Sequence, residues 1–397
     1  MKVTQINAVL EKGSTGKICA SISGKLSSKG IENYILYSSG KSTLQNSFLC
    51  ASRMELKIQA LKSRVLGNYG FNSVSQTKRM IKRLQQINPD IVHLHNIHGH
   101  DCHVEMLFDY LRDNNIKVFW TFHDCWAFTA YCPHYSMLKC DQWMDKCEKC
   151  PQRKRYSFFW DRSAYLFEKK QKSLSNIDLT IVTPSQWLAN QVEQSFLRDY
   201  PIKVINNGIN LNVFKPTESD FRAQHKISQN KKIVLGVAFD WGVRKGLDVF
   251  IELSKRLPNN EYKIVLVGTN EEIDTQLPSN IISIHKTHNQ SELAKIYTAA
   301  DVFVNPTRED TFPTVNIESL ACGTPVVTFD AGGSPEILND LCGRVVKLDD
   351  IDAMEMEIKH ICSEYPFSRE NCIERANEFD MNDRFEEYVE LYKDASK

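Results

Sequence analysis

The sequence predicts an α/β protein with two domains, each built on a doubly wound parallel sheet. Short apolar stretches of strand length alternate with longer amphipathic stretches along the 397 residues, which is typical of parallel sheets whose strands are joined by helices. The turn signal Asn206-Asn207-Gly208 divides the pattern into two similar halves. The chain is long enough for two domains, and an apolar content of 42% is enough to fill two cores.

The predicted strands are short apolar runs bounded by turn residues. They are expected at residues 2–8, 32–37, 91–95, 117–122, 179–183, 203–205, 233–238, 262–267, 281–283, 302–305 and 325–329. The predicted helices lie between these strands, at residues 17–29, 74–88, 104–114, 186–195, 247–256, 291–300, 314–322 and 383–393. Gly323-Thr324-Pro325 ends the helix at residues 314–322 before the next apolar run.

Composition argues against several classes of function. The formal net charge is zero, so no overall field directs the chain to nucleic acid or to an acidic membrane. Residues 1–13 read as a strand and not as a signal peptide, and the sequence has no apolar run near the roughly 18 residues of a membrane span. We expect a cytoplasmic protein whose twelve cysteines are reduced, so that a cysteine cluster suits metal better than disulfides.

The most informative stretch is residues 306–327, where an apolar strand leads through a polar loop into a helix. A helix start presents unpaired backbone N–H groups and the positive end of the helix dipole, which together bind a phosphate anion. Asp310 lies in the loop and Glu318 near the second helical turn, one on either side of this seat. A sugar nucleotide has phosphates that could bind at the helix start and hydroxyl groups on either side that could donate hydrogen bonds to these carboxylates. The segment therefore suits a sugar nucleotide. The alternative is an ordinary strand-to-helix turn of a Rossmann-like sheet.

This stretch resembles the acid-x7-acid signature of the retaining glycosyltransferases of family 4, also called group 1, with the GT-B fold. The reading E-D-T-F-P at residues 309–313 is most similar to the bacterial surface-polysaccharide branch. The usual first acid is Glu, whereas this chain has Asp310 preceded by Glu309. Either of these two acids could reach the donor sugar. The resemblance covers most of the chain, from the glycine loop near residue 13 to Glu336.

The resemblance implies two Rossmann-like domains facing a cleft. An acceptor domain is expected at residues 1–209, with a Cys-rich insertion near 132–150, and a nucleotide-sugar domain at 210–378. The string around residues 204–216 resembles the interdomain hinge of the family, and closure about residues 206–210 would exclude water. Residues 379–397 would form a helix that returns to the first domain.

Two further loops of the second half match the family. Lys245-Gly246 matches its K-G pair, whose lysine neutralises the donor diphosphate. The family's Arg six residues earlier is replaced by Phe239, so we expect Arg244 to take over its charge. Gly333 belongs to a loop, G-G-S-P-E at residues 332–336, that resembles the family's G-G-x-P-E near the donor phosphates. A solvent-exposed Arg-Lys pair in a loop is the alternative for residues 244–245.

The first half carries a glycine loop and a strand-end histidine. Gly13, Ser14 and Gly16 follow the first strand, where small residues let the backbone approach a phosphate. The spacing is not that of a Walker motif. His123 aligns with the family's active-site histidine, and Asp124 is expected to orient its imidazole or to bind acceptor. A packed, hydrogen-bonded residue is the alternative, and we favour it for His93.

Four cysteines form a C-x7-C-x6-C-x2-C pattern at Cys132, Cys140, Cys147 and Cys150. The final C-x2-C is half of a zinc knuckle, and four thiolates would make a closed structural site without an open catalytic position. A similar Cys-rich insertion recurs in the polysaccharide branch named above. Free thiols or one oxidised pair are the alternatives to a structural zinc.

Residues 52–83 are basic, with apolar residues interleaved. The favoured interpretation is a helix with a solvated charged face. The alternative is an amphipathic surface on the inner face of a membrane, which would bring the enzyme to a lipid-linked acceptor.

We therefore predict a retaining hexosyltransferase that moves a sugar from a nucleotide-diphosphate donor to a hydroxyl of a glycan or lipid-linked acceptor, in surface polysaccharide synthesis. The resemblance implies no metal for the chemistry, and we expect no nucleic-acid partner. His123, Asp310 and Lys245 are the predicted catalytic residues. Predicted substrate-binding residues of the central segment are Arg244, Glu309, Thr311, Phe312, Pro313, Thr314, Val315 and Glu318. The rivals are a sugar-nucleotide epimerase or phosphorylase of the same architecture and a non-enzymatic zinc-containing binding module.

Overall fold

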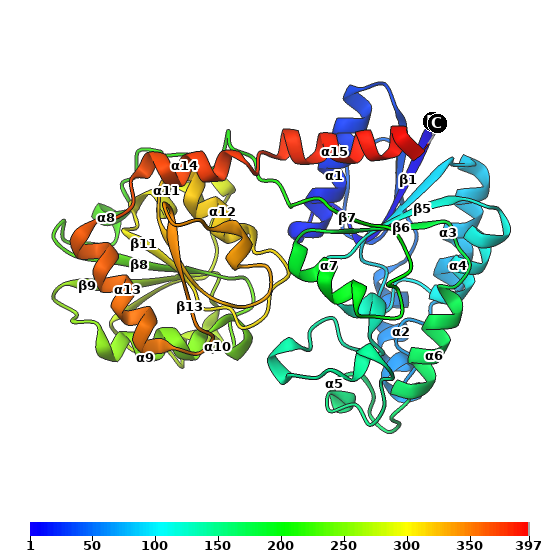
Figure 1. The fold of residues 1–397 in the computed structure, drawn as a ribbon, viewed down its shortest axis with the longest axis horizontal. Coiled ribbons are helices and arrows are strands. Elements are labelled where there is room, and N and C mark those ends of the chain that lie inside the picture. The colour runs from blue at the N-terminus through cyan, green and yellow to red at the C-terminus, as the bar shows by residue number, and fades with distance from the viewer. Residues whose placement is uncertain (396–397) are drawn as a thin grey trace. The chain divides into compact units, whose positions relative to one another are not determined.

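A computed structural model describes residues 1–395 as two α/β units (Figure 1). Unit 1 comprises Met1–Asn206 and Phe385–Lys397, and unit 2 comprises Asn207–Arg384. Each unit is built on one parallel sheet, so the predicted fold class is confirmed. Among the described residues, no helix is both long and apolar enough to cross a membrane.

Unit 1 contains a seven-stranded sheet whose strands all run parallel. Its strands are β1 (Lys2–Val9), β2 (Glu32–Ser39), β3 (Ser47–Leu49), β4 (Ile91–Leu94), β5 (Lys117–Thr121), β6 (Leu179–Thr183) and β7 (Ile202–Val204). They lie in the order β3-β2-β1-β4-β5-β6-β7. The order reverses between β1 and β4, which places the loops after these two strands at the switch point of the sheet.

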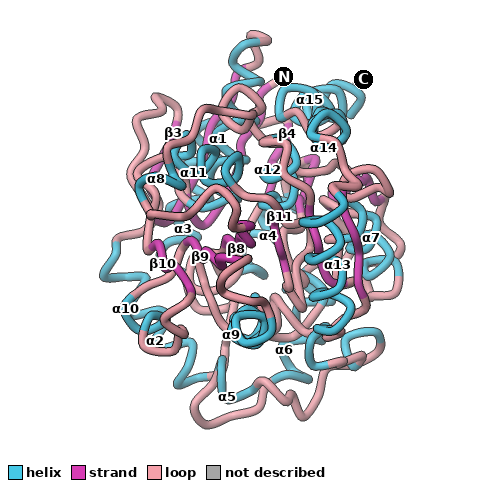
Figure 2. The backbone as a smooth tube through the Cα atoms, turned by 90° about the vertical axis from the view of Figure 1, so that its left-hand side faces the viewer, coloured by secondary structure: helices cyan, strands magenta, loops and turns pink. Residues whose placement is uncertain are grey.

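The helices of unit 1 connect these strands and cover both faces of the sheet (Figures 1 and 2). They are α1 (Gly13–Ser28), α2 (Arg53–Leu66), α3 (Val74–Ile87), α4 (Val104–Asp113), α5 (Arg153–Tyr156), α6 (Ser163–Ser173) and α7 (Gln186–Glu193). The central strands β4 and β6 are buried along their whole length, as expected for a parallel sheet covered on both faces.

Unit 2 contains a six-stranded parallel sheet. Its strands are β8 (Lys232–Val237), β9 (Tyr262–Val267), β10 (Ile281–Ile284), β11 (Val302–Asn305), β12 (Val326–Phe329) and β13 (Gly343–Val346), in the order β10-β9-β8-β11-β12-β13. Its helices are α8 (Phe221–Gln224), α9 (Leu247–Arg256), α10 (Glu271–Asp274), α11 (Gln290–Ala299), α12 (Thr314–Ala321), α13 (Ile351–Glu364) and α14 (Arg369–Asn377).

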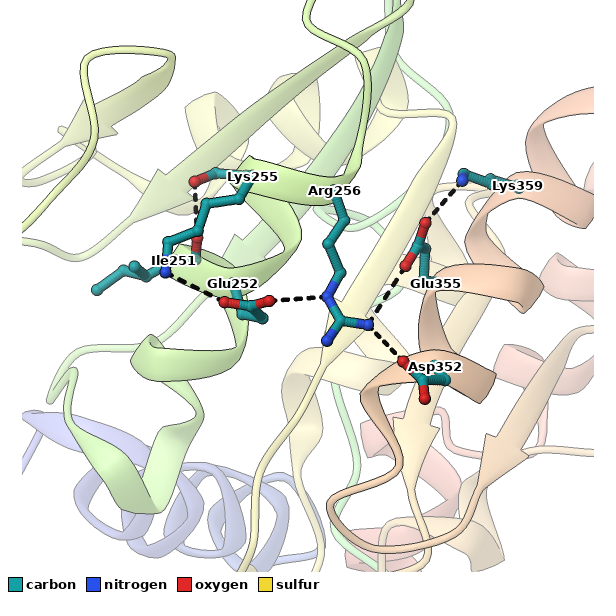
Figure 3. A network of polar contacts seen from close by, with 8 residues as sticks. Ile251, Glu252, Lys255, Arg256, Asp352, Glu355 and Lys359 are labelled. Carbon is teal, nitrogen blue, oxygen red and sulfur yellow. Dashed lines mark hydrogen bonds and ion pairs between the residues drawn. The ribbon is translucent and has the colours of Figure 1, made fainter.

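An ion-pair network fixes the end of α9 against α13 in unit 2 (Figure 3). Arg256 donates through Nε to Glu252 at 2.9 Å and through Nη1 to Asp352 at 2.5 Å. Glu355 lies 3.5 Å from the same Nη1 and also binds Lys359 at 2.6 Å. Exposed pairs contribute little one by one. Together they link α9, the helix between β8 and β9, to α13, the helix that follows β13.

The last helix, α15 (Met381–Ala395), runs from unit 2 into unit 1. Its unit 1 portion buries Phe385, Tyr388 and Tyr392. The Tyr388 hydroxyl lies 3.2 Å from Thr121 Oγ1, and the Tyr392 hydroxyl bonds to His93 Nδ1. The helix therefore places polar groups into the core of unit 1 together with its apolar surface.

We predict that Tyr392→Phe destabilises unit 1 by about 1–3 kcal/mol, because the buried His93 Nδ1 loses its partner. Urea unfolding monitored by circular dichroism checks this. Tyr365→Phe in unit 2, where the side chain is 60% exposed, is the matched control and should change little. Equal stability of the two variants would contradict the role of the Tyr392 hydroxyl.

Candidate active site

Neighbouring strands of unit 2 deliver the predicted donor-site loops to one edge of the sheet. β8, β11 and β12 lie side by side and pair in parallel, so their carboxyl ends share an edge. The chain passes from β8 outward to β10 and returns on the other side of β8 at β11. Ligands bind at such a reversal in doubly wound sheets, and here the adjoining loops carry Lys245 and Asp310.

The Lys245 ammonium forms an ion pair with the Asp310 carboxylate. These side chains are 14% and 22% exposed, so the pair is mostly shielded but still open to solvent. Arg244 Nη1 donates to the carbonyl oxygen of Glu309 at 3.3 Å, and the backbone N–H of Arg308 donates to the carbonyl oxygen of Arg244 at 2.9 Å. The loops after β8 and β11 are therefore joined through both main chain and side chains.

Two glycines allow the loops to approach this closely. Gly246 has φ +74°, and a Cβ there would lie 2.4 Å from the Pro306 carbonyl oxygen. Gly332 has φ +59°, and its Cβ would lie 1.8 Å from the Asp310 carbonyl oxygen. The neighbouring Gly333 donates its N–H to that same oxygen at 3.0 Å. The loop after β12 is thus fixed to the backbone of Asp310, and any side chain at residue 332 would separate them.

Arg308 holds the acidic loop in place and was not among the predicted residues. Its guanidinium donates to both oxygens of Asp248, at 2.8 and 2.7 Å, and to Asp349 at 2.6 Å. The side chain is only 11% exposed, and its bonds to Asp248 and Asp349 raise its pKa above the usual value. A sequence gives no sign of this role, because the partners of Arg308 are distant along the chain.

The helix α12 presents its N-terminus beside Asp310 and carries Glu318. Pro313 is the N-cap residue, and no described side chain caps the helix there. Glu318 Oε2 accepts a hydrogen bond from the Tyr297 hydroxyl at 3.2 Å. Tyr297 is fully buried, and burial together with Glu318 raises its pKa well above the usual value. The tyrosine therefore stays a neutral donor that orients the half-buried Glu318 carboxylate.

The other predicted residues of this segment are mostly buried. Glu309 and Thr311 are 5% and 8% exposed. The Phe312 ring packs on Phe379 with 5.7 Å between centroids, and its backbone N–H donates to Asp310 Oδ1 at 3.3 Å. The Phe312 side chain is therefore a packing residue.

The start of α12 offers groups of a different kind. Pro313 is buried, and Thr314 and Val315 are half-buried in the first helical turn. The backbone N–H groups of Thr314 and Val315 belong to the set that a helix leaves without intrahelical partners. Phe239, at the position of the family's arginine, is 91% exposed.

In unit 1, the glycine segment differs from the prediction. The helix α1 begins at Gly13, so Gly13, Ser14 and Gly16 lie in its first turn, and the expectation of a loop continuing to residue 17 is wrong. Glu11 and Gly13 adopt positive φ values of 56° and 66°, which turn the chain sharply after β1 and start the helix at once. A Cβ at Gly16 would lie 3.1 Å from the Glu11 backbone nitrogen, so this residue still allows a close backbone approach.

His123 follows β5 and is half-buried. Its Nε2 lies 3.1 Å from His95 Nδ1, and His95 Nε2 lies 3.0 Å from Gln5 Oε1. Asp124 was expected to orient His123 or to bind acceptor, but its Oδ2 lies 2.8 Å from His98 Nε2. The sequence alone did not identify His98 as the carboxylate's hydrogen-bond partner.

His93 is buried, with its Nε2 2.8 Å from Thr121 Oγ1 and its Nδ1 bound to Tyr392. It has the packed environment that we favoured from the sequence.

The buried groups around these histidines have shifted pKa values. Burial lowers the pKa of His123 to about 4, although Asp124 opposes the shift. Burial alone would raise the pKa of Asp124, but His98, His134 and the backbone N–H of Trp126 together lower it to about 2. Burial also disfavours charge on His98, yet Asp124 raises its pKa. At neutral pH, His123 is therefore neutral, and the ionised Asp124 beside it favours the protonated form of His98.

The four clustered cysteines lie close enough together to influence one another. The thiols of Cys132 and Cys150 are hydrogen-bonded, and Cys140 and Cys147 add to the rise in the pKa of Cys132. Within residues 1–395, no set of three or more His, Cys, Asp or Glu side chains is arranged to hold a metal ion. The structural zinc stays a prediction that metal analysis of the purified protein would test.

Two α/β units, each built on a parallel sheet, are the architecture of GT-B glycosyltransferases. Sequence profiles described as "Glycosyl transferases group 1" and "Glycosyltransferase Family 4" match residues 217–379 and 16–213. The two profiles together cover both units, and the chain belongs to the group 1, or family 4, glycosyltransferases.

Similar proteins include one described as "Putative colanic acid biosynthesis glycosyl transferase WcaC" of Escherichia coli (strain K12). It is 21% identical over 370 residues, which cover 88% of each chain. Among solved structures, a sucrose-phosphate synthase from Thermosynechococcus elongatus has a TM-score of 0.72 at 18% identity and covers 99% of this chain and 98% of its own. Anabaena Alr3699/HepE in complex with UDP-glucose has a TM-score of 0.69 at 14% identity, with 99% and 100% covered. These structures support the fold.

We predict that Asp101→Asn stabilises the protein increasingly as pH rises from about 4 to 7. Burial raises the pKa of Asp101 from its ordinary value of 3.8 to about 7, although His98 and Ser38 oppose this rise. In this window the unfolded chain loses the proton and the folded chain keeps it, so wild-type stability falls as pH rises. Asparagine does not ionise, so the variant keeps the free energy of unfolding that the wild type loses. This loss is about 1.4 kcal/mol per pH unit, or a few kcal/mol over the whole window.

Urea unfolding at a series of pH values measures this difference. Asp113→Asn, which changes an exposed acid at the end of α4, serves as the control. A difference between Asp101→Asn and wild type that stays constant from pH 4 to 8 would contradict the raised pKa.

Proposed function

We propose that this glycosyltransferase acts with retention, moving a hexose from a nucleotide-diphosphate sugar to a hydroxyl of a glycan or lipid-linked acceptor in surface polysaccharide synthesis. Membership of the family supports glycosyl transfer. The name of the relative from Escherichia coli supports a polysaccharide product. A structural relative described in complex with UDP-glucose supports a nucleotide-sugar donor.

The observation that carries the proposal is the Lys245–Asp310 pair beside the start of α12. A donor diphosphate would bring negative charge to the ammonium and to the helix N-terminus. Lys245 would then exchange part of its contact with Asp310 for phosphate oxygens, which leaves Asp310 to accept from sugar hydroxyls. Arg244, on the same loop, would add positive charge.

We assign the two acids to different parts of the donor. Glu318, oriented by Tyr297 at 3.2 Å, would accept from the ribose hydroxyls. Asp310 is favoured over Glu309 for the sugar, because Asp310 is 22% exposed whereas Glu309 is 5% exposed. The N–H groups of Thr314 and Val315 would hold phosphate oxygens, with Gly333 close by on the loop that binds Asp310.

In the proposed reaction the bond from the anomeric carbon to the phosphate oxygen breaks, and a bond to the acceptor oxygen forms on the same face. The departing diphosphate takes the acceptor's proton, so proton and charge balance. Its growing negative charge is stabilised by preorganised donors, and one well-placed donor contributes roughly 3 kcal/mol. His123, neutral because burial lowers its pKa to about 4, would contribute a hydrogen bond to the donor sugar or the acceptor.

A retaining transferase and an epimerase give different products from the same donor. Labelled UDP-, GDP-, TDP- and ADP-sugars with and without a polyprenyl-diphosphate-sugar acceptor would separate them. We expect transfer only with acceptor, with the donor's anomeric configuration kept in the product when read by NMR. Epimerised sugar nucleotide without acceptor, or an inverted product, would contradict the proposal.

Lys245→Ala should lower kcat by about 10²–10³, because a cation at the leaving diphosphate acts mainly in the transition state. Lys245→Arg should recover part of the loss. Lys226→Ala, at an exposed lysine of the same unit, is the control and should leave kcat unchanged. If Lys245→Ala keeps wild-type kcat with an unchanged circular dichroism spectrum, Lys245 does not act at the diphosphate.

A further inference from the structure

The helix α2 buries polar side chains and exposes apolar ones, the reverse of the usual arrangement in a surface helix of a globular protein. Its buried residues are the polar Gln59 and Ser63, and the side-chain oxygens of both are buried without a hydrogen-bond partner within the described part of the chain. Apolar side chains point outward instead: Met54, Ile58, Leu61 and Val65 are 68%, 46%, 60% and 37% exposed. Their spacing of four, three and four residues places them in one stripe along the helix.

A second exposed apolar group adjoins this stripe. Phe158, Phe159 and Trp160, which follow α5, are 48%, 63% and 62% exposed. Phe158 and Phe159 contact each other edge to face with centroids 6.2 Å apart. Large aromatic side chains are normally buried, and a run of three exposed ones marks an interaction site.

The two groups form one surface. The backbone N–H of Phe158 donates to the carbonyl oxygen of Arg64 at 2.8 Å, and the Arg64 guanidinium lies 5.7 Å from the Phe158 ring centroid. Arg162 Nη1 donates to the Leu66 carbonyl oxygen at 3.3 Å. Both views show α2 and α5 at the same end of unit 1 (Figures 1 and 2). We call this surface, made of α2 and residues 158–160, the apolar–basic face.

The apolar–basic face is surrounded by positive charge. Exposed basic residues on α2 and α5 are Arg53, Lys57, Lys62, Arg64, Lys154 and Arg155. The one acid on α2, Glu55, is bound by Arg79 at 2.7 Å. On a helical projection Lys57 and Arg64 lie to one side of the apolar stripe and Lys62 to the other. The chain as a whole has zero formal charge, so this concentration is local.

We propose that the apolar–basic face docks on an anionic phospholipid membrane. An apolar stripe flanked by Lys and Arg is the geometry of a helix that lies in a lipid interface, and Trp and Phe are favoured at that depth. Lipid phosphates complement the basic rim. A symmetric pair of these chains would bring one basic rim against the other, which disfavours self-association. The proposal needs no assumption about the reaction catalysed.

Vesicle flotation tests the proposal with the full-length protein. Vesicles of phosphatidylcholine with 30% phosphatidylglycerol should bind it, and vesicles of phosphatidylcholine alone should bind it much more weakly. Raising the salt concentration should weaken binding to the anionic vesicles. Lys57→Gln with Lys62→Gln should reduce the partition coefficient about 25-fold, at about fivefold per charge near the surface. Phe159→Ser with Trp160→Ser should reduce it at least tenfold.

Matched controls lie in unit 2. Leu341→Ser with Met356→Ser replaces side chains that are 58% and 61% exposed, and Lys226→Gln with Lys286→Gln removes two exposed charges. Both control pairs should bind vesicles as wild type does. Acyl chains brominated near the glycerol should quench Trp160 fluorescence, and Trp160→Phe should lose that quenching while it still binds. Thermal melts of each variant identify loss of fold.

Several results would overturn the proposal. One is equal binding of wild type and the Phe159/Trp160 variant to anionic vesicles. Another is no binding to anionic vesicles together with dimerisation in analytical ultracentrifugation that the same variant abolishes. That second result would assign the apolar–basic face to contact between copies of this chain.

Discussion

The proposed donor site depends on one constraint: the loops after β8, β11 and β12 must approach one another to backbone contact. Gly246 fits against the Pro306 carbonyl and Gly332 against the Asp310 carbonyl at distances that exclude a side chain. This approach puts Lys245 on Asp310 and the start of α12 beside them. Since the carboxyl ends of parallel strands share an edge, the fold brings the loops together, and the glycines let them close.

Charge complementarity is the basis of the proposed donor binding. Lys245, Arg244 and the helix N-terminus are positive, and Asp310 and Glu318 would accept hydrogen bonds from hydroxyl groups. Arg308, bound on both sides by Asp248 and Asp349, is already paired and holds the loop without competing for the ligand. In unit 1, burial keeps His123 neutral, while the Asp124 carboxylate is bound by His98 and raises the pKa of that histidine. In each unit, then, paired side chains hold a loop or a neighbouring residue in place, and different side chains are proposed to meet the substrate.

The sequence predicted the strands at the centre of both sheets and one edge strand of each sheet, β7 and β10. β9, β11 and α9 lie where they were expected, because their apolar pattern is strong and bounded by turn residues. The edge strands β3 and β13 were missed: they are short and half exposed, so they lack that pattern. The start of α1 was misplaced because positive φ values at Glu11 and Gly13 are not visible in the residue types.

The candidate site also has residues that the sequence could indicate and residues that it could not. Asp310, Glu318 and Lys245 could be proposed from the sequence because their neighbours form local patterns of the family. Arg308, Tyr297 and His98 could not, because each acts through a partner distant in the sequence. The orientation of α2 was also beyond prediction, since the sequence shows an amphipathic helix but not which face is buried.

The central claim is that unit 2 binds the donor by its diphosphate at Lys245. Calorimetric titration of the preferred nucleoside diphosphate and of its parent nucleoside, into wild type and Lys245→Ala, tests it most directly. The account predicts that the substitution weakens diphosphate binding at least tenfold and leaves nucleoside binding unchanged. Equal diphosphate affinity in the two proteins would contradict it.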